Sequence, residues 1–314
     1  MKNSKIPIGT STALARRRAV DRLARWVITG GGIAIILCIA AILVFISLEA
    51  WPLLRGARGG LTNRIDVAGM LDSAGAAPPS LSPVVAVGIE DYREIAYFIT
   101  EDGAVFFVSL ENMEVIGEHR IAGIGGERIS AVGASIDNRR YVIGTEDGTV
   151  LPLKVVFEQS FEEGDRRVLT PKVREGTPFS LARSPITQVR HHDDEDGGSM
   201  TAALTGDGRL FLMTRSVEET LFGEGKVTEV RQDLTGLLEG LAPTVIALDV
   251  HRRNLFVAVE GGRIAHLQVG GGSDPRVISV VDATSGPEVD VTALGFLVGG
   301  RSLAVGDASG KVSV

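Results

Sequence analysis

One arrangement of short apolar runs and tight turns occurs five times between residues 84 and 314. It constrains the fold more than any other feature of the chain. Each copy has an apolar run, a polar turn, a second apolar run, a glycine-containing turn and a third apolar run. The copies begin at Val84, Ile129, Ile186, Val245 and Val291, about 45–59 residues apart. A period near 45 residues, built of β-hairpins, is typical of propeller blades.

The turns before the third runs are Asp102-Gly103, Asp147-Gly148, Asp207-Gly208, Gly261-Gly262 and Ser309-Gly310. Asp-Gly between alternating runs predicts a hairpin, with positive φ at both central residues. We therefore expect residues 83–314 to form an all-β, WD40-like β-propeller of about five blades. The wider gaps at 155–186 and 214–245 should hold an outermost strand and a longer loop. A β-sandwich with similar hairpins is the alternative, and the Gly-His and Trp-Asp dipeptides of WD repeats are absent.

The fifth copy reaches Val314 inside what should be a strand. A propeller closes a ring of about 4–8 blades. We therefore expect a partial propeller and a chain that is the front portion of a longer reading frame.

An uncharged stretch of 23 residues, Trp26–Leu48, precedes the repeats. As a helix it would span roughly 35 Å, enough to cross a membrane core of about 30 Å. A cleaved signal peptide is the alternative, but its apolar region is shorter, at about 7–15 residues. The predicted organisation is a cytoplasmic basic tail (1–25), a transmembrane helix (26–48), a juxtamembrane linker (49–82) and the propeller (83–314).

Charge predicts the orientation of this helix. Seven Lys or Arg residues precede the span, and only Arg55, Arg58 and Arg64 follow it within a comparable distance. The positive-inside rule then places the N-terminus in the cytoplasm. We therefore expect the chain from about Trp51 on to lie outside the cytoplasm.

The densest group of ligand-type side chains is His191-His192-Asp193-Asp194-Glu195-Asp196. Consecutive residues cannot all point at one metal ion, and the repeat places this group at a turn. We interpret it as a solvated loop rather than a metal site. His119, His251 and His266 are isolated, and no Ser/His/Asp or Cys/His set can be assembled. The sequence predicts no catalytic, cofactor-binding or metal-binding residue, and a protein that is not an enzyme.

Three glycine-containing segments resemble known ligand-binding or helix-packing motifs. The segment Gly306–Val312 is one residue short of a phosphate loop and ends in Val where a Mg²⁺-binding Ser or Thr is needed. The segment Gly223-Glu224-Gly225 lacks the third glycine of a dinucleotide fingerprint. In the span, Gly30-Gly31-Gly32 allows close helix packing but is also ordinary in membrane helices.

The net charge of −7 argues against a nucleic-acid partner, because such binding needs clustered Lys and Arg. The only cysteine, Cys38, lies inside the span, so the outer domain contains no disulfide.

The first 54 residues resemble the start of phosphate-import ABC transporter permeases of the PstC type, in the long proteobacterial form. The matching residues are the run Arg16–Arg18, then Asp21-Arg22, Trp26, Gly30–Gly32 and the exit Glu49–Leu54. In that form, a propeller-like periplasmic insertion follows the first helix. The family's later helices and its ATPase-coupling loop are absent from this sequence, so none of its functional residues can be carried over.

The resemblance implies the N-terminal part of a permease subunit of an ATP-driven phosphate importer in a bacterial inner membrane, with a periplasmic propeller for docking or regulation. The implied partners are a second permease subunit, an ATP-binding subunit and a periplasmic phosphate-binding protein. The alternative is a single-pass, membrane-anchored β-propeller that serves as a scaffold or assembly factor in the periplasm.

Overall fold

The computed structural model describes residues 11–54, 69, 82–135, 139–162, 166–194, 196–218, 226–271, 274–284, 286 and 289–314. The chain divides into two compact units, Met1–Arg64 and Ile65–Val314. Most of the expected linker and the start of the basic tail lie outside the described residues.

The first unit contains one long helix, α1, from Ser11 to Ala50, followed by the 3-10 helix η1 (Trp51–Leu54). The helix therefore begins well before the expected span of 26–48. It ends beside Pro52, whose ring disfavours helical geometry at the preceding residue. From Val20 onward its described side chains are exposed, and Ile28 is 75% exposed. The segment Val20–Ala50 has a mean hydropathy of 2.9, long and apolar enough to cross a membrane.

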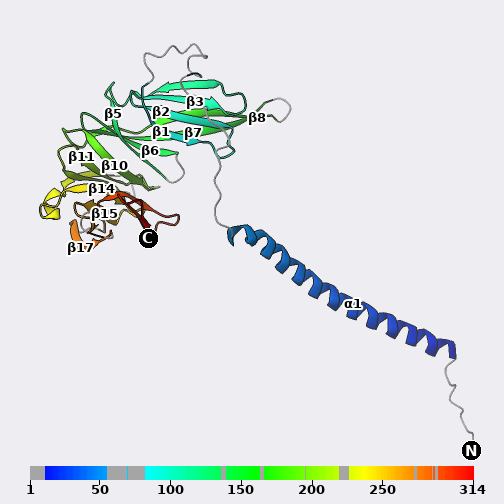
Figure 1. The fold of residues 1–314 in the computed structure, drawn as a ribbon. Helices are drawn as coiled ribbons and strands as arrows, with labels where there is room; N and C mark the ends of the chain where they lie inside the picture. Colours follow the sequence, from blue (N-terminus) through cyan, green and yellow to red (C-terminus); the bar gives the residue numbers. More distant parts are fainter. Residues whose placement is uncertain are drawn as a thin grey trace, which may run out of the picture. The chain divides into compact units, whose positions relative to one another are not determined.

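The second unit contains five antiparallel sheets, each formed by strands consecutive in the chain (Figure 1). The first sheet has β1 (Val84–Ile89), β2 (Ile95–Thr100), β3 (Ala104–Ser109) and β4 (Val115–Arg120). The second has β5 (Ile129–Ala134), β6 (Arg140–Thr145), β7 (Thr149–Glu162) and β8 (Arg166–Glu175), with β9 (Phe179–Ser180) paired to β7. The third has β10 (Ile186–Asp193), β11 (Ser199–Thr205), β12 (Leu210–Glu218) and β13 (Lys226–Asp233).

The 3-10 helix η2 (Thr235–Leu238) leads into the fourth sheet. That sheet has β14 (Pro243–Leu248), β15 (Asn254–Val259), β16 (Arg263–Gln268) and β17 (Arg276–Asp282). The fifth sheet has β18 (Val291–Phe296), β19 (Leu303–Asp307) and β20 (Val312–Ser313). This series of up-and-down sheets confirms the WD40-like β-propeller fold behind one helix. The predicted outermost strands are present in both wide gaps, as β8 and β13.

The core lies between sheets, as it does between propeller blades. Ile95, Tyr97 and Leu151 join the first sheet to the second, whereas Val142 and Ile186 join the second to the third. Separate clusters fill the third–fourth and fourth–fifth interfaces. Burial of such side chains stabilises the unit by about 1.5–3 kcal/mol each.

Hydrogen bonds also join the first strands of neighbouring sheets. The Ser130 hydroxyl on β5 donates to the Ile186 carbonyl on β10 (2.8 Å). The Gln188 side chain on β10 donates to the Thr244 carbonyl (2.6 Å) and accepts from the Ile246 amide (3.1 Å), both on β14. These bonds fix the register between sheets.

The expected turn geometry is wrong for the three Asp-Gly turns. Only the glycine adopts positive φ in each, at 80° for Gly103, 85° for Gly148 and 77° for Gly208. The residue three positions before each glycine explains the difference, because its carbonyl accepts a hydrogen bond from the glycine amide. This is a turn closed by a glycine in the left-handed region, rather than a two-residue turn. The Gly261-Gly262 turn does have two positive φ values, 79° and 71°.

Candidate functional site

The hairpin turns of the first three sheets share a polar cluster built on Thr-x-Asp-Gly. In the third sheet, the Thr205 hydroxyl donates to Asp207 and accepts from the Arg209 amide (3.2 Å). Thr100 and Thr145 make the same two bonds in the first and second sheets. All three threonines are buried. The motif therefore holds the turn and leaves its polar groups paired.

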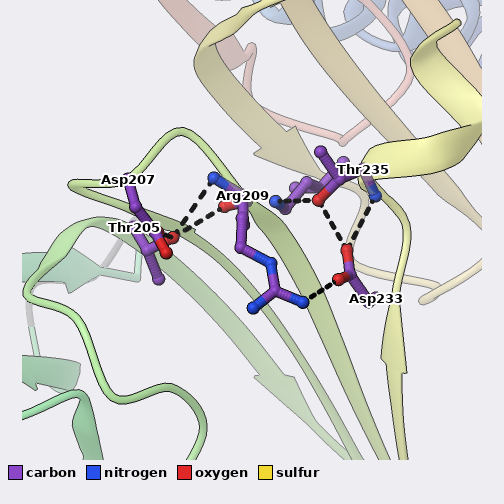
Figure 2. Close-up of polar contacts among 6 residues, drawn as sticks. Thr205, Asp207, Arg209, Asp233 and Thr235 are labelled. Atoms are coloured by element: carbon purple, nitrogen blue, oxygen red, sulfur yellow. Dashed lines mark hydrogen bonds and ion pairs between the residues drawn. The ribbon is translucent and has the colours of Figure 1, made fainter. Parts of the chain in front are cut away.

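The third sheet extends this cluster to a second strand, as Figure 2 shows. The Arg209 guanidinium donates to Asp233, which also accepts from the Thr235 hydroxyl (2.5 Å) and amide (3.0 Å). The Thr235 hydroxyl accepts in turn from the Leu210 amide (2.9 Å). Every labelled polar side chain in this group has a partner within the protein. We call Thr205, Asp207, Arg209, Asp233 and Thr235 the turn cluster.

The fifth sheet has the same turn with acid and hydroxyl exchanged. Asp307 takes the threonine position and accepts from the amides of Ser309 (2.9 Å) and Lys311 (3.0 Å). The Ser309 hydroxyl donates to the same carboxylate (2.6 Å) and, as the largest cause, lowers the pKa of Asp307. The segment Gly306–Val312 is therefore a strand–turn–strand hairpin, in which the Gly310 amide donates to the Asp307 carbonyl (3.0 Å).

A different polar group lines a cavity of about 280 Å³ between the second and third sheets. Its apolar wall includes Tyr141, Val142, Pro152 and Leu153. Its polar lining includes Arg140, Lys154, Arg174, Glu175, Arg190, His191, His192 and Asp193. We call these eight residues the cavity group. The cavity is slightly smaller than a typical drug-sized pocket of about 300–1,000 Å³, so it is suited to a small group.

The histidines expected in a loop belong instead to strand β10, which runs through Asp193. The strand continues because each of its last residues is paired with β11, with His191 opposite Thr201. The His191 ring is hydrogen-bonded to the Thr201 hydroxyl (2.7 Å), and Nε2 of His192 lies 3.1 Å from the Leu248 carbonyl. Burial lowers the pKa of His191 to about 4 and also lowers the pKa of His192. Both rings are therefore neutral at pH 7.

The acidic residues that follow the histidines separate from one another. Asp193 pairs with Arg140 of β6 (3.2 Å). Asp194 pairs with Arg252 (2.5 Å) and caps the amide of Gly198 (2.6 Å). Glu195 lies outside the described residues, and Asp196 is exposed. Among the described residues, no group of three His, Cys, Asp or Glu side chains is arranged to hold a metal ion.

The remaining candidates from the sequence are dispersed. The His119 ring lies 3.0 Å from Glu175, whereas His266 stacks on Phe256 with ring centroids 4.6 Å apart. His251 is exposed, and the Gly223–Gly225 segment lies outside the described residues. Within the described chain, the glycines Gly30–Gly32 of α1 have no neighbour within 4 Å of an added Cβ.

The sequence did not predict a role for Lys154 and Arg190, two cations of the cavity group. They differ from Arg209 of the turn cluster in how their charges are paired. Lys154 and Arg190 have no carboxylate within 4 Å among the residues that the structure describes. The Arg190 guanidinium donates only to the Val189 carbonyl (2.9 Å). Burial lowers the pKa of Arg190, since the charged form is poorly solvated there. The sequence signal was the placement of Arg190 directly before the histidine pair.

No family model matches this chain, and no curated protein matches it. Among solved structures, the chain is similar to the β-propeller domain of Cps50 (Swd1) from Myceliophteria thermophila, at 18% identity and a TM-score of 0.45. The similarity covers 72% of this chain, which spans 62% of that one.

The resemblance to phosphate permeases of the PstC type is wrong. Such a permease is a multi-span membrane protein. The described residues contain a single helix able to cross a membrane, followed by propeller sheets. The arginine run, the glycines and the Trp-Pro exit are features that other membrane-anchored helices can share, so they did not identify a family. The partners implied by that resemblance lose their basis with it.

Proposed function

We propose that this chain is a single-helix-anchored β-propeller that acts as a docking scaffold at the outer face of a bacterial inner membrane. The observation that carries the proposal is the combination, in one chain, of an exposed apolar helix and a propeller. Segment Val20–Ala50 is apolar and long enough to cross a membrane, and its side chains are exposed. Exposure of such an apolar surface to water is unfavourable, whereas a bilayer can bury it.

The role proposed for the propeller is binding rather than catalysis. Its sheets form a rigid frame, and the loops and cavities on such a frame are where proteins place recognition groups. In the turn cluster the polar side chains are used to hold hairpins, whereas the cavity group contains cations without a carboxylate partner. This difference supports recognition at the cavity.

The orientation rests on the basic residues before the span. Arg22 and Arg25 are exposed on α1, on the N-terminal side of its apolar part. With the N-terminus cytoplasmic, the propeller is periplasmic.

The orientation can be tested with single cysteines introduced into a Cys38→Ser chain, which has no other cysteine. Glu111→Cys places a thiol in the exposed turn between β3 and β4. Ser4→Cys provides the matched thiol in the basic tail. In intact spheroplasts, a membrane-impermeant maleimide should label the first variant alone and the second only after permeabilisation. Reversed labelling, or release of the chain by alkaline carbonate, would contradict the proposal.

The scaffold role makes a separate prediction. Extracted in mild detergent from the membranes of its own host, the chain should migrate as a complex larger than the purified recombinant chain in the same detergent. Equal migration of the two samples would exclude a stable scaffold.

A further inference from the structure

We propose that the cavity between the second and third sheets is a binding site for a carboxylate group, presented by an acidic side chain of a docked peptide or by a small free acid. This inference rests on the proposed docking function for the peptide source only. The juxtaposition that carries it is one partly buried guanidinium, which has no carboxylate partner among the described residues, beside an apolar wall. Strand β10 provides the cation, and strands β6 and β7 provide the wall.

The charge balance of the cavity group favours an anion. Its two carboxylates are already engaged: Asp193 pairs with Arg140 (3.2 Å), and Glu175 accepts from the Gly123 amide (2.7 Å) and contacts His119. Arg174 of β8 pairs with Glu158 of β7 (3.5 Å). Within the cavity group, the two cations that have no carboxylate partner among the described residues are Arg190 and Lys154. A bound anion would supply the missing partner of Arg190.

Carboxylate suits this site better than a dianion. Arg190 is the inner cation, whereas Lys154 is exposed at the rim. One inner positive charge matches one negative charge, and a guanidinium presents paired N–H donors that match a carboxylate. The lining by Tyr141, Val142 and Leu153 would have to dehydrate any occupant, which costs more for a doubly charged ion. The neutral His191 and His192 add no further positive charge at pH 7.

The cavity size sets the scale of the occupant. A space of about 280 Å³ accommodates one or two side chains rather than a folded surface. Gly176 lines it and is exposed, so an extended peptide can approach the main chain there. This permits a peptide to insert an Asp or Glu side chain while its backbone stays at the rim.

The experiment uses the full chain in detergent micelles with histidine labelled for NMR. The chain has five histidines, and two of them line the cavity, so the imidazole signals report on the site directly. The probe is N-acetyl-aspartate N-methylamide, and its neutral isostere is N-acetyl-asparagine N-methylamide. Free acetate and inorganic phosphate form the other two arms.

We expect the aspartate probe to shift the His191 and His192 signals saturably and to leave His251 unchanged. A bound negative charge should also raise the pKa of His191. The asparagine isostere should give no saturable shift. Binding of the aspartate probe tighter than acetate would assign the site to a peptide side chain, whereas equal or weaker binding would assign it to a free small acid.

Variants locate the binding group. Arg190→Met should weaken the probe affinity by about tenfold or more, and Arg190→Lys should recover part of it. Lys154→Met replaces an exposed side chain, so it tests the rim without endangering the fold, and should weaken binding about threefold. The matched control is Lys226→Met, an exposed lysine on β13, which should leave the affinity unchanged.

Absence of a saturable shift, unchanged affinity in both cavity variants, or tighter binding of phosphate than of either carboxylate would overturn the proposal. These results are independent of the proposed scaffold role. Orientation and complex formation are measured in membranes without the probe, so either proposal can fail alone.

Discussion

The turn cluster and the cavity group both combine Arg, Asp and neighbouring polar side chains. The turn cluster belongs to the third sheet, whereas the cavity group comes from the second and third sheets, and the charges of the two groups are paired to different degrees. In the turn cluster, Arg209 donates to Asp233 and Thr205 bonds to Asp207 and the Arg209 amide. In the cavity group, Arg190 donates only to a main-chain carbonyl. The contrast separates polar groups that hold the fold from polar groups available to a ligand.

Electrostatics shows the same contrast. The Thr145 hydroxyl is the largest cause lowering the pKa of Asp147, and Thr205 has the same effect on Asp207. In the cavity group, burial is the largest cause lowering the pKa values of Arg190 and His191. Hydrogen bonds thus favour charge in the turns, whereas desolvation disfavours it in the cavity.

The largest expected effect is on the turn cluster. Thr205→Val keeps the side-chain shape but leaves the Arg209 amide and the Asp207 carboxylate without their bond to the hydroxyl. We expect the free energy of unfolding to fall by about 2 kcal/mol, because the partly buried Arg209 amide and the Asp207 carboxylate both lose a hydrogen-bond partner. Both tryptophans lie in the first unit, so urea unfolding of the full chain should be followed by circular dichroism. Thr205→Ser keeps the hydroxyl and should lose clearly less; equal losses would contradict the role assigned to the bond.

A smaller effect should arise from protonation in the cavity group. The folded pKa of His191, about 4, lies below its ordinary value of 6.5. Between these values the unfolded chain binds more protons, so stability falls as pH drops from about 6.5 to 4. We expect His191→Gln to reduce the loss of folding free energy between pH 6.5 and pH 4 by on the order of 1–2 kcal/mol.

Measurement of the unfolding midpoint at pH 7, 6, 5 and 4 tests this. His251→Gln is the control, because His251 is exposed. An identical slope in the wild type and in His191→Gln would show that His191 does not titrate in this way.

The smallest effects sharpen the comparison most, because one arginine is changed in each region. Arg209→Met should lower the free energy of unfolding by about 0.5 kcal/mol, through loss of a half-exposed ion pair. Arg190→Met should leave it unchanged or raise it slightly, since it removes a partly buried cation without a carboxylate partner. Paired urea melts of the two variants measure this difference. A larger loss in Arg190→Met than in Arg209→Met would indicate a structural role for Arg190.

The alternation of apolar runs and glycine turns was sufficient to predict the propeller. The first strands of four sheets begin at the predicted Val84, Ile129, Ile186 and Val291. Local pattern succeeds here because each sheet is an up-and-down series of consecutive strands, so its pairing is also local in sequence. The same local pattern failed for His191 and His192. Their strand is extended by pairing to β11, and polar side chains gave no sign of it.

The family and the site could not be read from the sequence. Features such as a basic run, a glycine triplet and a Trp-Pro exit follow from what a membrane demands of a helix, so they are shared by unrelated chains. The sequence by itself determined the apolar helix and the repeated hairpins, because both depend on neighbouring residues. Only the tertiary structure decided which charges are paired. Arg209 pairs with Asp233, 24 residues away, and Arg140 pairs with Asp193, 53 residues away, whereas Arg190 is partly buried and has no carboxylate partner among the described residues. The first of these ion pairs depends on how β12 and β13 pair within the third sheet, and the second depends on how the second and third sheets pack. No local pattern encodes either arrangement.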